Sequence, residues 1–245
     1  MEFLKKLAKK EGAPSDNAPV TVGFLGDSVT NGCFELRTYT DDEGNSAFLD
    51  TFDHENSYSV YVRKILLTLY PHAQINIINA GISGDRAEKA LKRVDRDLLP
   101  YRPDVTVVCF GLNDSVKGEG YIPTYRSCLK EIIRKVKDSG SEVILMTPQP
   151  ICARPHPLVT DKKLKEYSVE FSEVFQSGLF GRFMDAAKDV AAEENVPLCD
   201  VYSKWMAMYE NGVDITELLA NYLNHPKREM HWLFAHSLVE TMFKN

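Results

Sequence analysis

The stretch VTVGFLGDSVTNG, residues 20–32, determines how the rest of the chain is interpreted. It begins as an apolar run of strand length, the run stops at Gly26, and Asp27 and Ser28 follow before the chain turns polar. Short runs of β-branched and aromatic residues bounded by glycine are typical of buried strands. Ser28 is therefore either a nucleophile displayed at the end of a strand or an N-cap of the helix that follows.

Similar apolar runs recur along the chain and alternate with longer amphipathic stretches. The further predicted strands are 75–80, 105–111, 142–148 and 196–201. The predicted helices between them are 57–70, 84–100, 124–140 and 181–195. Strands and helices that alternate at this spacing form right-handed crossovers, so the pattern predicts an α/β fold with a parallel sheet and helices on both faces.

Composition limits the classes of function. The 245 residues are 44% hydrophobic and 26% charged, which is typical of a chain that buries a core. The formal net charge of −6 argues against nucleic acid as a partner, because phosphate binding needs a basic face. No apolar run reaches the ~18 residues of a membrane helix, so no membrane partner is expected.

Cysteine usage and the N-terminal residues predict a cytoplasmic location. Five cysteines are scattered without CxxC pairs, which favours buried thiols in a reducing compartment. The stretch MEFLKKLAKKEG at residues 1–12 mixes charges with apolar residues and lacks the apolar core of a signal peptide.

The chain is predicted to form one domain with two special segments. Residues 1–18 are expected to be an N-terminal lead-in segment, helical or frayed, and residues 19–245 a single domain. Residues 34–56 are polar and longer than the usual loop of 2 to 6 residues between a strand and a helix. We expect them to form a long, irregular active-site loop beside Ser28.

Polar residues and glycines follow several predicted strands, where ligands of open parallel sheets bind. Ser28 follows the first strand, Gly81 the second and Asn113 the third, and His225 lies in a loop before the last predicted helix. Acyl transfer needs a nucleophile, a base and donors for the oxyanion. Ser28 would attack with His225 as base, and the N–H groups of Ser28 and Gly81 and the amide of Asn113 would form the oxyanion hole.

Four blocks in this order resemble the SGNH, or GDSL, hydrolases. The blocks are GDS at 26–28, NAGISG at 79–84, GLND at 111–114 and HP at 225–226. The resemblance implies a three-layer α/β/α sandwich, flavodoxin-like, with about five parallel strands, and Ser28, Gly81, Asn113 and His225 as the four residues that name the family. It also implies hydrolysis of carboxylic esters, often acetyl groups on carbohydrates or short acyl chains on small alcohols.

One position departs from that family. The family usually has an aspartate three residues before its histidine, and this chain has Tyr222 there. Three alternatives remain for orienting His225: a backbone carbonyl that completes a Ser-His dyad, an amide from Asn221 or Asn224, or a carboxylate from elsewhere, such as the loop at 53–55. We favour the dyad, because control of the histidine tautomer needs only an acceptor at Nδ1.

Simpler roles are expected for the neighbouring residues. Asp27 and Asp114 are predicted to be structural, with hydrogen bonds to backbone N–H groups. His231 lies within the last predicted helix and is expected to pack or to line the pocket. Gly84 is expected to serve helix packing. Neither the histidine spacing nor the acidic cluster at 53–55 matches a common zinc pattern, so we expect no metal and no cofactor.

Two rival functions stay open. One is a flavodoxin-like module whose SVTNG loop (residues 28–32) binds phosphate or flavin, although Asp27 would repel a phosphate. The other is an inactive relative that binds acylated sugars. Under the esterase interpretation the polar segment 34–56 favours a small-molecule or oligosaccharide ester of a polar alcohol. The sequence gives no prediction of oligomeric state.

Overall fold

The computed structural model describes residues 1–44 and 46–245, and a parallel sheet lies at its centre. The strands are β1 (Val20–Gly26), β4 (Ile75–Gly81), β5 (Val105–Cys109), β6 (Glu142–Thr147) and β7 (Leu198–Asp200). They pair in parallel in the order β4-β1-β5-β6-β7. The predicted five-stranded parallel sheet is therefore confirmed.

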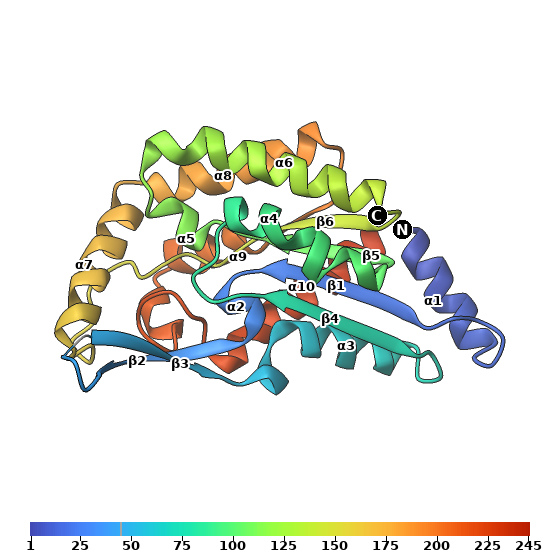
Figure 1. Cartoon of the computed structure of the whole chain (residues 1–245), viewed down its shortest axis with the longest axis horizontal. Coiled ribbons are helices and arrows are strands. Elements are labelled where there is room, and N and C mark those ends of the chain that lie inside the picture. Colours follow the sequence, from blue (N-terminus) through green and yellow to red (C-terminus); the bar gives the residue numbers. More distant parts are fainter. Residues whose placement is uncertain (45) are drawn as a thin grey trace.

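Helices cover both faces of this sheet (Figure 1). One face carries α4 (Ala87–Asp97), α6 (Ile122–Asp138) and α8 (Leu179–Glu193). The other face carries α3 (Tyr58–Leu69) and α10 (His231–Lys244), which pack against each other. Each helix packs buried apolar residues against the sheet, so the predicted three-layer, flavodoxin-like sandwich is confirmed.

The strand order reverses at β1, and this reversal creates the crevice where ligands of such sheets bind. In the register of the sheet, Gly26 at the end of β1 lies between Gly81 of β4 and Cys109 of β5. A Cβ on Gly26 would lie 2.0 Å from Oγ1 of Thr30, so only glycine permits the tight turn after β1. The segments that follow β1, β4 and β5 consequently meet at one edge of the sheet.

The first residues form a helix, α1 (Glu2–Gly12), which buries Phe3 and Leu7 against the core. Its first two N–H groups donate to the carboxylate of Glu142 at the start of β6, at 3.0 and 2.6 Å. Helix termini leave such donors without partners, and the carboxylate satisfies them. The lead-in segment is thus helical as expected, and it packs against the rest of the chain.

The prediction for residues 34–56 was wrong about their structure. They contain most of an antiparallel hairpin, β2 (Cys33–Thr40) and β3 (Ser46–Phe52), followed by a short 3-10 helix, η1 (His54–Asn56). The turn includes Gly44 at φ +85°. Leu36 and Phe48 line a pocket, whereas residues such as Tyr39 and Leu49 are exposed, so polar and apolar residues are mixed along both strands without a clear strand pattern.

The remaining elements connect the sheet to the site. They are the short helices α2 (Ser28–Asn31) and α5 (Leu112–Ser115), the helices α7 (Lys162–Gln176) and α9 (Val201–Glu210), and the 3-10 helices η2 (Leu99–Tyr101), η3 (Glu119–Tyr121), η4 (Ile215–Leu218) and η5 (Arg228–Met230). Sequence analysis assigned no element to the region of α7. No helix of the described residues is long and apolar enough to cross a membrane.

Candidate active site

Ser28 is the first residue of α2, and only Asp27 separates it from the end of β1. Asp27 caps this helix, because its carboxylate accepts the N–H of Val29 at 3.0 Å. Gly32 ends the helix with φ +86°. The serine is therefore the first residue of a one-turn helix, where its own N–H has no acceptor inside the helix. The residue is 3% exposed and lines the pocket described below.

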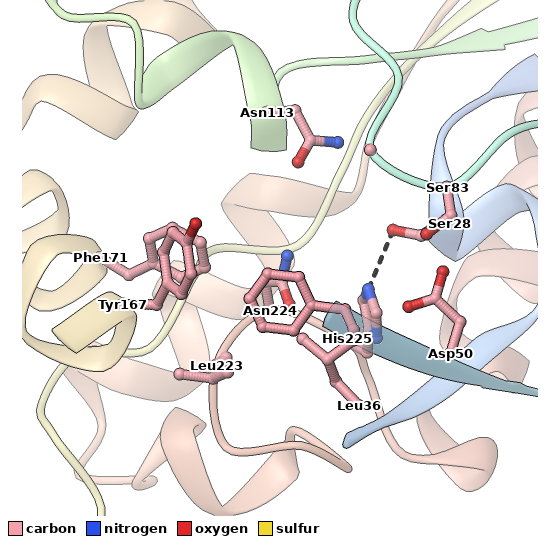
Figure 2. Close-up of a pocket in the computed structure, with 12 residues that line it drawn as sticks. Ser28, Leu36, Asp50, Ser83, Asn113, Tyr167, Phe171, Leu223, Asn224 and His225 are labelled. Atoms are coloured by element: carbon pink, nitrogen blue, oxygen red, sulfur yellow. Dashed lines mark hydrogen bonds between the residues drawn. The ribbon is translucent and has the colours of Figure 1, made fainter. Parts of the chain in front are cut away.

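His225 meets Ser28 across 197 residues of sequence. Its Nε2 lies 2.9 Å from Oγ of Ser28, as the dashed line in Figure 2 shows. The histidine sits in a tight loop held by Asn221, whose side-chain oxygen accepts the N–H groups of residues 223, 224 and 225, each at 3.0 Å. This geometry allows the imidazole to take a proton from the hydroxyl.

A backbone carbonyl faces the other ring nitrogen. Nδ1 of His225 lies 3.3 Å from the carbonyl oxygen of Phe34 on β2. When Nδ1 carries the proton and donates it to this carbonyl, Nε2 is left as an acceptor toward Ser28. The arrangement corresponds to the first of the three alternatives, the dyad with a carbonyl.

The Asn221–Asn224 pair and the acidic residue Asp53 are each bonded elsewhere, not to Nδ1 of His225. The amide of Asn221 donates to Oδ1 of Asn224 at 3.0 Å, so both amides hold the loop rather than the imidazole. Asp53 in the loop at 53–55 accepts from Arg228 at 2.7 Å. Tyr222 stacks its ring on His156, with ring centroids 3.9 Å apart. The alternative in which Asn221 or Asn224 orients the His225 ring is therefore corrected.

Burial determines the charge of His225. It lowers the pKa of this imidazole to about 4, against weaker opposing effects from the Asp50 charge, the Phe34 carbonyl and the Glu35 charge. A histidine with this pKa is neutral at pH 7 and can accept a proton. The protonated form that acyl transfer requires is correspondingly costly in this environment.

Asp27 and Asp114 hold backbone segments around the site. Asp27 caps α2 through the N–H of Val29. The carboxylate of Asp114 accepts the N–H of Ala87, at the start of α4, at 3.1 Å. Desolvation by burial raises the pKa of each carboxyl to about 7. Both contacts are of the structural kind expected for these residues.

The two glycines of the second block occupy different places from those expected. The N–H of Gly81 donates to the side chain of Asn79 at 3.0 Å, and a Cβ at position 81 would lie 2.4 Å from the nitrogen of Asn31. Gly84, at φ +70°, lines the pocket with Ser28. The structure therefore points to Gly84 rather than Gly81 as the glycine next to the reacting atoms.

Asn113 reaches the pocket from α5. One N–H of its amide donates to the carbonyl of Asp85 at 2.9 Å, and the second remains for a ligand.

Arg93 holds the segment that contains Asp85. Its buried guanidinium donates to the carboxylate of Asp85 at 2.7 Å. Arg93 also donates to the carbonyls of Ala80 and Gly26 at 2.7 and 3.1 Å. It therefore fixes the ends of β1 and β4 relative to each other.

The pocket has a polar end and an apolar end (Figure 2). Its volume is about 360 Å³, and Ser28 and His225 stand at the polar end. The other polar lining residues are Asp50, Ser83, Gly84, Asn113 and Asn224, and the apolar ones are Leu36, Phe48, Tyr167, Phe171 and Leu223. The hairpin and α7 supply most of the apolar wall, so the face of segment 34–56 that lines the pocket is less polar than its composition suggested.

Sequence reasoning missed these wall residues and Asp50. In β3, Phe48 and Asp50 are two positions apart, so they share the face that lines the pocket. Leu36 on β2 is the residue that pairs with Asp50. The DDEGN stretch at 41–45 contains turn-forming residues between two short segments with aromatic and β-branched residues, and this is the signal that indicates a hairpin. Recognising that turn would have placed these residues on one face.

His231 packs in the core. Its Nδ1 accepts the N–H of Tyr58 at 3.0 Å, and its ring lies 4.8 Å from that of Phe34. Burial lowers the pKa of His231 to about 3. Across residues 1–44 and 46–245, no group of three or more His, Cys, Asp or Glu residues is arranged to hold a metal ion.

Comparison with known proteins identifies relatives in sequence. A family model described as the GDSL-like Lipase/Acylhydrolase family matches residues 24–233. An acetylxylan esterase of Geobacillus stearothermophilus is 29% identical over 134 residues, which are 51% of this chain and 58% of the relative. An arylesterase of Vibrio mimicus is 35% identical over 80 residues, 32% of this chain and 39% of the relative. These alignments thus span about half the length of the relatives.

Solved structures share the fold over nearly the whole chain. A catalytic mutant of an acetylxylan esterase from Geobacillus stearothermophilus superposes with a TM-score of 0.64 at 18% identity and covers 92% of this chain and 95% of its own. An α/β hydrolase enzyme from the metagenome of Lake Arreo superposes with a TM-score of 0.65 at 19% identity. The match covers 92% of this chain and 96% of that enzyme. At these identities the likeness establishes the architecture.

Proposed function

The chain belongs to the GDSL-like lipase/acylhydrolase family, and from this premise we propose that it is a serine esterase that hydrolyses carboxylic esters through an acyl-enzyme on Ser28. The observation that carries the proposal is the 2.9 Å contact between Oγ of Ser28 and Nε2 of His225 at the polar end of a pocket. The esterase names of the two sequence relatives support the same class of reaction.

The reaction proceeds in two halves. The Ser28 oxygen attacks the ester carbonyl carbon while its proton passes to Nε2 of His225, and the carbonyl π electrons move onto the oxygen. The tetrahedral adduct then collapses, the bond to the alcohol oxygen breaks, and His225 returns the proton to that oxygen. A water molecule repeats the sequence on the acyl-serine, which releases the acid and restores the Ser28 hydroxyl.

Donors at the polar end stabilise the oxyanion of each adduct. The N–H of Ser28 and the second amide N–H of Asn113 are two of them. We assign the third to the N–H of Gly84, because the N–H of Gly81 is already bonded to Asn79. In this proposal Gly84 takes the oxyanion-hole role that sequence analysis assigned to Gly81.

For the substrate we propose a short acyl group, such as acetyl, on a carbohydrate or another polar alcohol. An acetyl group fills only a small part of a pocket of about 360 Å³, which leaves room for part of the alcohol. The relative named acetylxylan esterase supports a sugar. Asn224 offers a hydrogen-bonding group to a hydroxyl near the reacting carbon.

Covalent labelling and turnover test the proposed nucleophile together. The purified protein should hydrolyse a chromogenic acetyl ester and gain one phosphonyl group from a fluorophosphonate probe, located on Ser28 by peptide mass spectrometry. Ser28→Ala should lose both properties, whereas Ser83→Ala, which removes the neighbouring pocket hydroxyl, should still be labelled. Equal background rates in wild type and Ser28→Ala would contradict the esterase and leave the binding of acylated sugars as the function.

A second substrate class is favoured by the apolar end of the pocket. Leu36, Phe48, Tyr167, Phe171 and Leu223 together form a wall that suits an alkyl or aryl acyl group. Comparing kcat/KM for acetylated xylo-oligosaccharides with kcat/KM for esters of C8 or longer acids separates the two classes. A clear preference for the long chains would replace the acetyl-sugar substrate with an apolar acyl ester.

A further inference from the structure

The hairpin brings a carboxylate to the reacting pair. Asp50 on β3 is paired with Leu36 on β2, two residues beyond the Phe34 carbonyl that faces Nδ1 of His225. Both Asp50 and Leu36 line the pocket, and Figure 2 shows the Asp50 side chain beside the imidazole of His225 and below Ser28. One hairpin thus supplies a carbonyl to one ring nitrogen and a carboxylate to the surroundings of the same ring.

His225 needs a negative charge close by when it becomes protonated. The imidazole is buried, and burial opposes the cationic form. The Phe34 carbonyl offers a dipole to Nδ1 but no formal charge. Tyr222, three residues before the histidine, stacks its ring on His156 and brings no carboxylate to this position. A carboxylate from another part of the chain is the remaining way to stabilise the imidazolium.

The other titratable groups near this ring are already engaged or are uncharged. Glu35 accepts from the Arg228 guanidinium at 2.6 and 3.2 Å, and Asp53 accepts from the same group at 2.7 Å. Asp27 uses its carboxylate to cap α2. His231 on α10 supplies no charge at pH 7, because burial lowers its pKa to about 3.

Asp50 lacks such a partner. Within residues 1–44 and 46–245, no lysine, arginine or histidine forms an ion pair with this side chain, whereas the neighbouring acids Glu35 and Asp53 share Arg228. Asp50 also raises the pKa of His225 more than any other charge does. The charge of Asp50 is therefore available to act on the imidazole.

We propose that the Asp50 carboxylate stabilises protonated His225 through space during acyl transfer, while the Phe34 carbonyl orients the neutral ring. This inference rests on the proposed esterase function and assigns to β3 the charge that position 222 does not supply. Asp50 acts through His225 and makes no bond to the substrate carbonyl. One aspartate at Nδ1 would both orient the ring and stabilise its positive charge. Here β2 supplies the orienting carbonyl and β3 supplies the charge.

Steady-state kinetics on three variants test the proposal. Asp50→Asn keeps the shape and removes the charge, so kcat for a chromogenic acetyl ester at pH 7 should fall 10- to 100-fold, with KM within about twofold of wild type. Asp50→Glu restores the charge and should retain kcat within about fivefold. Asp42→Asn removes one charge from the exposed turn of the same hairpin and should leave kcat unchanged.

The pKa of the imidazole is the second measurement, since a purely structural role would not move it. Titration of the His225 ring by NMR should give a lower pKa in Asp50→Asn than in wild type, because the charge that favours the imidazolium is gone, and no change in Asp42→Asn. Unfolding midpoints identify any variant that fails to fold, and Asp50→Ser then replaces Asp50→Asn.

Three outcomes overturn the proposal. The first is a kcat for Asp50→Asn within twofold of wild type. The second is a raised KM at constant kcat, which would make Asp50 a substrate contact. The third is an unchanged imidazole pKa. If instead wild type neither hydrolyses esters nor reacts with fluorophosphonate, the esterase function fails, and the NMR titration still decides whether Asp50 acts on His225.

Discussion

The carbonyl oxygen of Phe34 lies 3.3 Å from Nδ1 of His225, a contact between residues 191 positions apart. It makes the hairpin part of the site, because the ring orientation of the histidine depends on where β2 lies. Arg228 holds that strand in place: its guanidinium bonds to Glu35 and Asp53 and lies 4.2 Å from the centre of the Phe34 ring. The first prediction follows from this clamp.

Replacing Arg228 by methionine should lower kcat about 10-fold. Arg228→Met retains the apolar stem of the side chain and removes the guanidinium. That group joins Glu35 on β2 and Asp53, just after β3, to the segment that follows His225. The hairpin then moves more freely, and the Phe34 carbonyl spends less time at Nδ1. Esterase kinetics and thermal unfolding of the same samples measure the change. Arg134→Met, which removes an exposed pair with Glu194, is the matched control.

The Arg228 prediction distinguishes positioning from general stability. A fall in unfolding temperature with kcat unchanged would mean that the clamp serves only the fold. Equal losses of kcat in Arg228→Met and Arg134→Met would show that the effect is not specific to the hairpin.

Activity should persist into acidic solution. Burial lowers the pKa of His225 to about 4 from its ordinary 6.5, so the base stays neutral as the pH falls through 6 and 5. We expect kcat/KM for an acetyl ester to be constant from pH 8 to about pH 5 and to reach half its maximum near pH 4. A midpoint between pH 6 and 7 in the pH–rate profile would mean that the imidazole is solvated.

The two glycines of the second block should respond differently to alanine. A Cβ at Gly81 would lie 2.4 Å from the nitrogen of Asn31, so Gly81→Ala should destabilise the fold by about 3 kcal/mol. Nothing lies within 4 Å of a Cβ at Gly84, and only its φ of +70° opposes the change, at about 1 to 2 kcal/mol. Urea unfolding measures both values. The reverse order would contradict the assignment of Gly84 to the pocket and Gly81 to packing.

Asp27→Asn should stabilise the protein as the pH rises. Burial raises the pKa of Asp27 from 3.8 to about 7 in the folded state, so the folded protein holds this proton more tightly than the unfolded chain does. The resulting contribution to the free energy of unfolding is complete below pH 3.8 and is lost as the pH rises toward 7. Asparagine still caps α2 and cannot ionise. The free energy of unfolding of Asp27→Asn minus that of wild type should therefore grow between pH 4.5 and 7.5, by at most about 4 kcal/mol.

Urea unfolding at the two pH values provides the test of Asp27. Asp16→Asn, an exposed residue in the turn after α1, should show no such growth. If the Asp27→Asn difference is the same at both pH values, then Asp27 is ionised in the folded protein.

Much of the architecture could be predicted because it depends on local pattern. The strands β1, β5 and β6 are mostly apolar, as strands buried on both faces must be, and the helices between the strands have apolar residues at helical spacing. The hairpin was missed because each of its strands has one face in solvent, so its composition resembles that of a loop. Composition averages over two faces that the tertiary structure separates.

Sequence alone also determined which residues reach one edge of the sheet. Blocks that follow β1, β4 and β5 must meet there, and Ser28, Asn113 and His225 do line one pocket. It assigned the oxyanion role to Gly81 and packing to Gly84, because the hydrogen bonding and the backbone angle in which these glycines differ are not recorded in the sequence.

The order of apolar runs and polar blocks along the chain determined the sheet, its layers and the serine at the end of β1, because those features follow from periodicity and turn chemistry. Only the tertiary structure decided what faces His225. A carbonyl at Phe34 and a carboxylate at Asp50 belong to a hairpin about 190 and 175 residues earlier in the chain, and backbone carbonyls leave no mark in the sequence. Their approach to the imidazole depends on how the hairpin packs, which no local pattern records.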